Sequence, residues 1–313
     1  MTNTKRALVT GITGQDGSYL ARNLLGRGYE VHGLYRHSSC DNLWRIREIL
    51  DSITLHKGDV TDPLCVDDIV SSSYDEIYHL ADQDNVGWSK HLSHATMNVT
   101  IGGTINILEA VKNWYPEGFV KVFVPVSATM FGSNPAPQNE KTRLDPQSPY
   151  ACAKASVYHL CRYYRREYKV YVSCGIMYNH DSPKRGPDYL LQKICRAAKQ
   201  ASSLRPLLMG NLDLEVDIGY APDFMEAAIR ILELDKPDDF IVSTGKGYSI
   251  KQMIEMAYLY NGISNPWSCD VVQDADRPNQ PTLIGDNSKV VEATGMAFND
   301  LKVIIPIIMD ELK

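Results

Sequence analysis

The stretch ALVTGITGQDG, residues 7–17, decides the fold of this chain. Its first four residues are apolar and end at a glycine, which predicts a short buried parallel strand. Gly11, Gly14 and Gly17 follow in G-x-x-G-x-x-G spacing and lead into an amphipathic helical pattern. Glycines let the backbone turn sharply and approach a pyrophosphate, whose charge meets the amides at the helix N-terminus. A glycine turn without a ligand is the alternative, but the strand before it and the helix after it favour a dinucleotide site.

Strands and helices alternate along the rest of the chain. Further apolar runs of strand length lie at 30–35, 53–60, 76–84, 120–127, 170–179 and 239–245, and helical patterns lie at 97–114 and 148–168. This alternation predicts an α/β fold with a doubly wound parallel sheet, the Rossmann arrangement, whose ligands bind at the carboxyl ends of the strands. We expect residues 1–178 plus about 216–246 to form this NADP-binding domain. Residues from about 179–215 plus 247–313 should form a smaller C-terminal lobe that binds the substrate.

A group of candidate catalytic residues follows the fifth apolar run. That run ends in Ser127, with Thr129 two residues later, and the segment SPYACAK sets Tyr150 four residues before Lys154. Four residues make about one helical turn, so Tyr150 and Lys154 share a helix face. A lysine cation beside a phenol lowers the phenol's pKa from its usual value of about 10. With Ser127 on the same reacting oxygen, these groups can move a proton on and off a hydroxyl while a nicotinamide handles the hydride.

The end of the second strand indicates which dinucleotide is bound. It carries Arg36, Ser38 and Ser39 where NAD-binding chains have a carboxylate for the ribose hydroxyls. An arginine with two serines suits a 2′-phosphate, so we predict NADP rather than NAD, with Arg45 as a further cation. A solvated surface arginine is the alternative.

Other strand ends and one loop supply further binding candidates. Asp59 and Val60 end the third strand, where an adenine can be held, and Leu80, Ala81 and Gln83 should pass beneath the cofactor. The segment after Asn179 is polar and rich in Lys and Arg, as expected of a loop that faces a nucleotide diphosphate. Its candidates are Lys184, Arg185 and Lys193, and Arg277 is a candidate phosphate clamp nearer the C-terminus.

Composition excludes several classes of function. The net charge of −6 argues against general nucleic-acid binding. Seven cysteines without a C-x-x-C pair predict reduced thiols in the cytoplasm and no zinc site. We find no signal-peptide core and no apolar run of membrane-spanning length, so no membrane is expected. His91 and His94 have H-x-x-H spacing without an apparent third ligand, so no metal is predicted.

These motifs resemble the extended short-chain dehydrogenase/reductases and, within them, the GDP-mannose 4,6-dehydratase family. The resemblance covers nearly the whole chain and is carried by VTGITGQDGSYLA, RHSS, SPYACAK, YNHDSPKRG, GNLD, RPNQP and LIGDNSK. It implies a homodimer or homotetramer in which the Arg36 loop reaches a neighbouring subunit's cofactor, and a GDP-linked sugar near Asn179, Lys193 and Arg277. The implied NADP contacts are Gly11, Thr13, Gly14, Gln15, Asp16, Gly17, Arg36, Ser38, Ser39, Asp59, Val60, Leu80, Ala81, Gln83, Lys154, His180 and Arg185.

The chain departs from this family at the catalytic segment. Where the family has T-S-E-L-Y-G, residues 127–132 read SATMFG, so Ser127 keeps the hydroxyl but Thr129 replaces the glutamate. In the family that carboxylate removes the C5 proton and helps to expel the C6 hydroxyl as water, and a threonine hydroxyl is far too weak a base for this. Asp82, at a position that the family gives to a small residue, is the nearest candidate replacement. The S-A-T-x-aromatic-G form instead resembles UDP-galactose 4-epimerase and related sugar reductases.

The substrate segment departs as well. Val216, Ile218 and Tyr220 stand where the family has arginine, tryptophan and histidine, which argues against GDP-mannose itself. We therefore predict NADP-dependent hydride transfer at C4 of a GDP-hexose, by a 4-keto reductase or a 4-epimerase, with Tyr150 as the acid/base. A GDP-mannose 4,6-dehydratase with a relocated base is the first alternative. An inactive cofactor-binding paralogue is the second, and the intact set of Ser127, Tyr150 and Lys154 argues against it.

Overall fold

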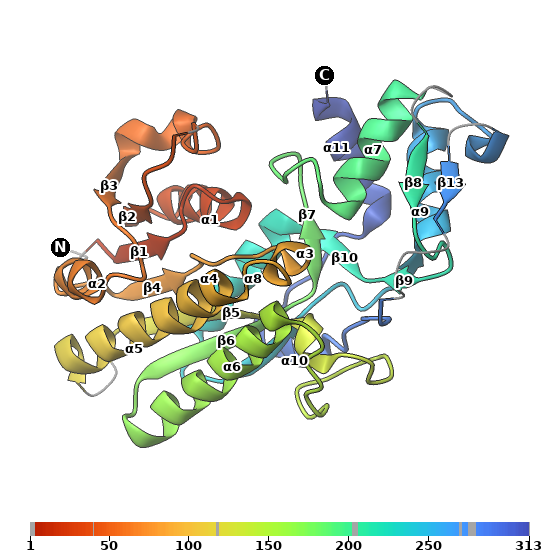
Figure 1. Ribbon diagram of the computed structural model, residues 1–313. Coiled ribbons are helices and arrows are strands. Elements are labelled where there is room, and N and C mark those ends of the chain that lie inside the picture. Colours follow the sequence, from red (N-terminus) through yellow and green to blue (C-terminus); the bar gives the residue numbers. More distant parts are fainter. Residues whose placement is uncertain are drawn as a thin grey trace.

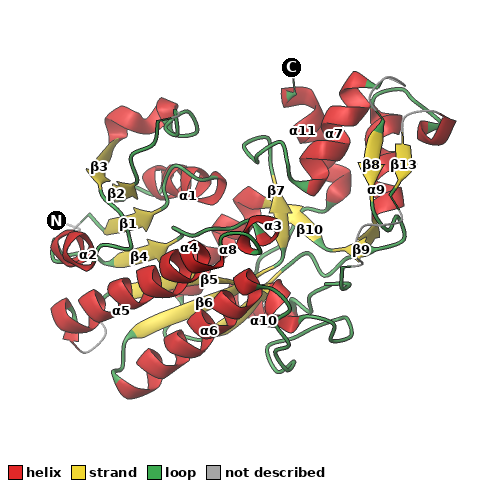
Figure 2. Ribbon diagram, in the orientation of Figure 1, coloured by secondary structure: helices red, strands yellow, loops and turns green. Residues whose placement is uncertain are grey.

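Seven parallel strands form the centre of the molecule, as the alternating pattern predicts (Figures 1 and 2). The computed structural model describes residues 4–39, 41–116, 119–201, 206–268, 271–274 and 280–312. The strands are β1 (Arg6–Thr10), β2 (Glu30–Tyr35), β3 (Ile53–Lys57), β4 (Glu76–His79), β5 (Lys121–Ser127), β6 (Tyr171–Met177) and β11 (Asp239–Val242). Their order across the sheet is β11-β6-β5-β4-β1-β2-β3, and every neighbouring pair is parallel.

Helices cover both faces of the sheet, which is why the central strands are buried on both sides. One face carries α2 (Pro63–Val70), α5 (Gly103–Trp114) and α6 (Pro149–Glu167), and the other carries α1 (Gln15–Gly26), α8 (Ala221–Glu233) and α10 (Ser288–Thr294) (Figure 1). Every residue of β4 and of β6 is buried. The predicted doubly wound α/β sheet is therefore confirmed.

The strand order reverses between β1 and β4. The chain runs outward through β2 and β3 and then returns to the other side of β1, where β4, β5 and β6 follow in sequence. Crossovers that leave in opposite directions open a crevice at the carboxyl ends of these two strands, which is where ligands of this fold bind. The glycine turn follows β1, and the segment with Leu80 and Asp82 follows β4, so both lie at this crevice.

A smaller lobe stands beyond the carboxyl ends of the strands, at the upper right of Figure 1. Its helices are α7 (Leu190–Gln200), α9 (Ile250–Tyr260) and α11 (Leu301–Glu311), which share one apolar cluster. Three short strand pairs complete it: β7 (Asn179–Asp181) with β10 (Ile218–Tyr220), β8 (Leu207–Met209) with β13 (Val271–Gln273), and β9 (Glu215–Val216) with β12 (Tyr248–Ser249). Within the described ranges, no helix is both long and apolar enough to cross a bilayer.

The buried apolar side chains of the described residues form two clusters, a large one and a small one. The large cluster joins the sheet to its covering helices and includes Val290 and Met296, so α10 packs against the sheet and not against the lobe. The small cluster includes Leu191, Met253 and Ile304. The domain boundaries themselves stay a prediction.

The glycine turn gives a prediction with an internal control. A Cβ at Gly17 would lie 2.4 Å from the backbone oxygen of Gly11, whereas a Cβ at Gly26, the last residue of α1, would meet nothing within 4 Å. We expect Gly17→Ala to cost about 1–3 kcal/mol of unfolding free energy, because the backbone of the turn must move. Gly26→Ala should be neutral or stabilising by up to about 1 kcal/mol. Urea denaturation of both variants measures this, and equal stabilities would contradict the tight packing of the turn.

Candidate active site

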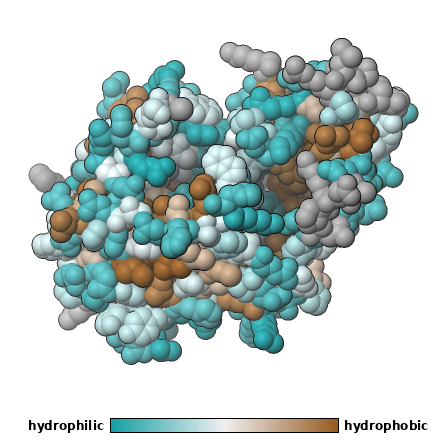
Figure 3. All heavy atoms as spheres, viewed as in Figure 1, coloured by the Kyte–Doolittle hydropathy of each residue, from teal (hydrophilic) through white to brown (hydrophobic). Residues whose placement is uncertain are grey.

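A cavity of about 350 Å³ lies at the carboxyl ends of β4, β5 and β6, where the lobe faces the sheet. In Figure 3 the outline of the molecule is notched between these two parts. The cavity brings together candidates that are far apart in sequence. Those that line it are Asp16, Leu80, Asp82, Ser127, Thr129, Tyr150, Lys154, Asn179, His180 and Arg185.

The glycine turn has the shape that a dinucleotide requires. Gly11 has a φ of +68°, and a Cβ there would lie 2.9 Å from backbone atoms of Ala81. The turn and the end of β4 therefore touch backbone to backbone, and the amide of Ala81 also donates to Thr10 Oγ1 at 3.1 Å. Gly14 caps α1 without a side chain, so nothing at that position stands between the helix N-terminus and an anion. These residues fit a bound pyrophosphate.

The cation expected at a 2′-phosphate lies at the carboxyl end of β2. The Arg36 side chain is 74% exposed, and its Nη1 lies 4.0 Å from Oδ2 of Asp59. Ser38 and Ser39 follow it and are also exposed. A guanidinium that is mostly exposed and lies 4.0 Å from this carboxylate is accessible to a phosphate.

Arg45 does not join this group, contrary to the sequence-based expectation. Its Nε donates to the carbonyl of Lys184 at 2.8 Å, and its Nη1 donates to the carbonyl of Thr13 at 3.3 Å. Arg45 therefore ties the glycine turn to the loop after β7.

The remaining cofactor candidates lie along the crevice. Val60 is buried and its carbonyl accepts from the Asn106 amide at 2.8 Å. Leu80 lines the cavity. The Gln83 side chain is turned to its own loop, where it donates to the carbonyl of Asn85 at 3.2 Å.

His180 and Asp16 form an ion pair at one end of the cavity. Nε2 of His180 lies 2.9 Å from Oδ2 of Asp16, and Nδ1 lies 2.8 Å from the carbonyl of Tyr178. Both partners only accept, so both ring nitrogens carry a proton. Burial disfavours the imidazolium, but Asp16 outweighs burial and raises the pKa of His180. Burial alone would raise the pKa of Asp16, and the His180 charge instead lowers it to about 2.

A second ion pair lies beside the first. Arg185 Nη1 is 3.2 Å from Oδ2 of Asp84, and the guanidinium stacks on the ring of Tyr189 at 3.6 Å from its centroid. Burial opposes the charge of Arg185, and Asp84 outweighs it, so the pKa of Arg185 is raised. Sequence patterns singled out Arg185 but gave no sign of this carboxylate partner.

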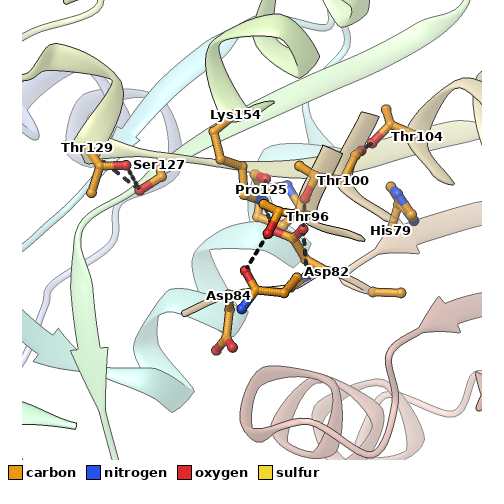
Figure 4. Close-up of polar contacts among 12 residues, drawn as sticks. His79, Asp82, Asp84, Thr96, Thr100, Thr104, Pro125, Ser127, Thr129 and Lys154 are labelled. Carbon is orange, nitrogen blue, oxygen red and sulfur yellow. Dashed lines mark hydrogen bonds and ion pairs between the residues drawn. The ribbon is translucent and has the colours of Figure 1, made fainter. Parts of the chain in front are cut away.

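Ser127 and Thr129 form a directional pair at the end of β5. The hydroxyl of Thr129 donates to Ser127 Oγ at 2.9 Å, and its amide donates to the same atom at 3.2 Å (Figure 4). Ser127 Oγ thus accepts twice, which directs its own hydrogen elsewhere and polarises it. Burial raises the pKa of Tyr150, and the side-chain hydrogen bond between Ser127 and Tyr150 opposes that rise. Thr129 therefore positions Ser127, and Ser127 faces Tyr150.

Tyr150 and Lys154 share one face of α6, as their spacing predicts, and Lys154 Nζ lies 5.8 Å from the centroid of the Tyr150 ring. Ser148 begins this helix by accepting from the amide of Ala151, which fixes the register of both residues. The expected lowering of the phenol's pKa is wrong. Burial raises the pKa of Tyr150 to about 12 and exceeds the opposing effect of Lys154.

Asp82 adds to the effect of burial on Tyr150, because it is paired with the Lys154 ammonium. Its Nζ lies 2.6 Å from Oδ2 of Asp82 and donates to the carbonyl of Pro125 at 2.8 Å. Asp82 was expected only as a replacement base. The structure makes it the counter-ion of Lys154, which weakens the field that Lys154 exerts on Tyr150.

The substrate candidates are not all gathered at the cavity. Asn179 lines it, whereas Lys193 is exposed on α7 and is not among its lining residues. Arg277 lies outside the described residues. Sequence reasoning missed Asp181, a buried carboxyl that lines the cavity two residues after Asn179 and so shares its strand face. Burial raises the pKa of Asp181 to about 7.

Among the described side chains, no group of three or more His, Cys, Asp or Glu is arranged to hold a metal ion.

Comparison with known proteins places this geometry in a family. The model of the GDP-mannose 4,6 dehydratase family matches residues 8–296. GDP-mannose 4,6 dehydratase 2 of Arabidopsis thaliana is 38% identical over 307 residues, which cover 93% of this chain and 82% of that protein.

Solved structures show the same fold. UDP-glucose 4-epimerase from Thermotoga maritima superposes with a TM-score of 0.87 at 20% identity, over 98% of this chain and all of that one (100%). RMD from Pseudomonas aeruginosa does so with a TM-score of 0.81 at 21% identity, over 98% of each chain. With the family model covering nearly all of the sequence, the chain belongs to the GDP-mannose 4,6-dehydratase family of extended short-chain dehydrogenase/reductases, whose members modify nucleotide sugars with a nicotinamide cofactor.

Proposed function

We propose that this chain catalyses hydride transfer at C4 of a GDP-linked hexose, as a 4-keto reductase or a 4-epimerase. The observation that carries the proposal is that Ser127, Tyr150 and Lys154 line one cavity at the crevice beside the glycine turn. Tyr150 gives or takes the proton of the C4 oxygen. Ser127 orients that oxygen, and Lys154 orients the phenol and the cofactor.

The cofactor proposed is NADP, which supplies or accepts the hydride when bound. The glycine turn and the start of α1 would hold its pyrophosphate, and Arg36 would meet the 2′-phosphate. The exposed guanidinium at the end of β2 supports NADP over NAD. A homodimer or homotetramer in which the Arg36 loop reaches a neighbouring cofactor is proposed from the family alone.

We also propose that this chain does not remove water from its sugar substrate. The charges of the cavity support this. Thr129 cannot act as the base at C5, and its hydroxyl is engaged by Ser127. Asp16, Asp82 and Asp84 each pair with a cation of the cavity wall. A carboxylate held by a cation is a weaker base than a free one, because the charged form is stabilised.

A 4,6-dehydratase is the second candidate, and the names of the relatives favour it. The Arabidopsis relative is named a GDP-mannose 4,6 dehydratase, and dehydration also begins with oxidation at C4. The cavity offers one buried carboxyl suited to a relocated base. Asp181 has a pKa raised to about 7 by burial, which is near the value that a general base needs at neutral pH.

Product analysis separates the two. The protein is incubated with GDP-mannose alone, and with the 4-keto-6-deoxy derivative plus NADPH. We expect NADPH to be consumed only with the keto sugar, or an isomer to form without net change of cofactor. Tyr150→Phe should lower either rate by about 10²–10⁴-fold, since the acid/base group is gone. A 4-keto-6-deoxy product from GDP-mannose alone would establish the dehydratase instead.

Thr129→Val tests the hydrogen bond to Ser127. The change keeps the branched shape of the side chain and removes its hydroxyl. Ser127 Oγ then accepts only from the amide of residue 129. We expect kcat to fall roughly 5- to 10-fold, which corresponds to one neutral hydrogen bond. Thr129→Ser restores the hydroxyl and should recover most of the rate. A Val variant as fast as the wild type would show that Thr129 does not act through Ser127.

Asp181→Asn tests the buried carboxyl through stability as well as activity. The folded pKa of about 7 lies above the unfolded value near 3.9, so the folded state binds more protons between these pH values. Stability from this group is therefore lost as pH rises from about 4 to 7. The variant should show a smaller fall of Tm over this range than the wild type. Asp188→Asn, at an exposed aspartate of the same cavity, is the control. If the protein proves to be a dehydratase, Asp181→Asn should also lower water loss by about 10²–10⁴-fold.

A further inference from the structure

Asp82 and Lys154 form an ion pair inside the catalytic wall. Oδ2 of Asp82 lies 2.6 Å from Lys154 Nζ, and the two side chains are only 10% and 7% exposed (Figure 4). The pair joins the loop after β4 to α6. Because water scarcely reaches it, each charge is compensated mainly by the other.

The carboxylate is held from a second direction as well. Its Oδ1 accepts from the hydroxyl of Thr100 and from the amide of Gln83, the latter at 2.7 Å. Thr100 belongs to a π-helical turn, Asn98–Gly102, which continues into α5. A π-turn places one extra residue in the helix and is often found at functional sites. This turn presents the Thr100 hydroxyl to the carboxylate, so Oδ1 of Asp82 is held by hydrogen bonds while Oδ2 contacts Lys154 as an ion pair.

The ammonium of Lys154 has three donors, and the protein engages two of them. One contacts Asp82 and one donates to the carbonyl of Pro125. One donor remains for the cavity. Lys154 can therefore still orient a ribose or the phenol, but the net charge of the pair is zero.

We propose that Asp82 is a positioning residue that neutralises Lys154 and keeps Tyr150 protonated, so that the site is a proton donor and its first substrate is a 4-keto sugar nucleotide. The inference rests on the proposed function and adds the direction of the hydride transfer, which is reduction of a C4 ketone. In this step C4 gains a hydride from a reduced nicotinamide, the C4 oxygen gains the proton of Tyr150, and the ketone becomes an alcohol. The phenolate then recovers its proton from solvent.

The other charged groups around the phenol agree with this direction. Tyr150 is faced by Lys154 on its own helix, by Asp82 and Asp84 on the loop after β4, and by Tyr189 on the loop before α7. Burial and the two carboxylates raise the pKa of Tyr150, and Lys154 lowers it. Two carboxylates and one ammonium therefore face the phenol of Tyr150, and this balance of charge favours its protonated form.

The charged groups around Lys154 also show that Asp82 is its counter-ion. Burial disfavours the ammonium of Lys154, but Asp82 outweighs burial and raises its pKa. His79 lies behind the pair and adds no second cation at neutral pH, because burial and Lys154 lower its pKa to about 4. Lys154 therefore stays charged, and Asp82 is the group that cancels its charge.

The test measures the ionisation of Tyr150 in the cofactor-free protein, where no sugar or turnover is needed. Tyrosine is labelled with ¹³C at Cζ, and the Tyr150 signal is assigned by its loss in Tyr150→Phe. We expect Asp82→Asn to lower the pH at which Tyr150 titrates by about one unit or more, because a nearby negative charge is removed. Asp84→Asn, on the same loop but with an exposed side chain paired to Arg185, is the matched control and should produce a smaller shift.

Activity supplies a second readout. In the reduction of the keto sugar, the fall of kcat/KM at high pH should move to lower pH in Asp82→Asn by the same amount as the titration. Asp82→Ala tests the same charge with a smaller side chain, and melting curves show whether each variant is folded. A folded Asn or Ala variant in which Tyr150 titrates at the wild-type pH would overturn the inference and leave Asp82 a structural ion pair. A titration shift in a protein that turns over no GDP-sugar would uphold the role of Asp82 and remove the proposed function.

Discussion

The position of one buried ammonium organises this active site. Lys154 lies on α6 and contacts a carboxylate from the loop after β4, a carbonyl from β5 and its own helix neighbour Tyr150. A charge in such a place is costly unless it is paired. The pairing with Asp82 meets that cost, and it also determines how much of the positive charge the phenol experiences.

The cavity as a whole repeats this pairing. Its cations His180, Arg185 and Lys154 each have an aspartate at ion-pair distance, and each aspartate comes from the start of α1 or from the loop after β4. Charges arranged in this way hold the loop after β7 against the glycine turn and the end of β4. The same cations are then preorganised for phosphate and hydroxyl groups, since no long side chain has to be ordered when a ligand binds.

Family membership and site geometry point to different final steps. The relatives are named as dehydratases, and hydride transfer at C4 is common to dehydration, epimerisation and keto-sugar reduction. The final step proposed for this chain depends on the residues at positions 129 and 82. A hydroxyl that orients Ser127 and a carboxylate that neutralises Lys154 suit proton donation at C4, whereas Asp181 is the one buried carboxyl among the described lining residues that is not tied to a cation at ion-pair distance.

The sequence by itself determined the sheet, the glycine turn and the spacing of Tyr150 and Lys154. These depend on local regularities, namely apolar runs, glycines with a required φ and one helical turn of separation, which short stretches of sequence record directly. Only the tertiary structure decided the partners of those residues. Asp82 and Lys154 are 72 positions apart in the numbering and Asp16 and His180 are 164 apart, and no local pattern encodes which carboxylate meets which cation. The direction of the Tyr150 pKa was therefore beyond the sequence, because burial and a distant countercharge set it and both exist only once the chain has folded.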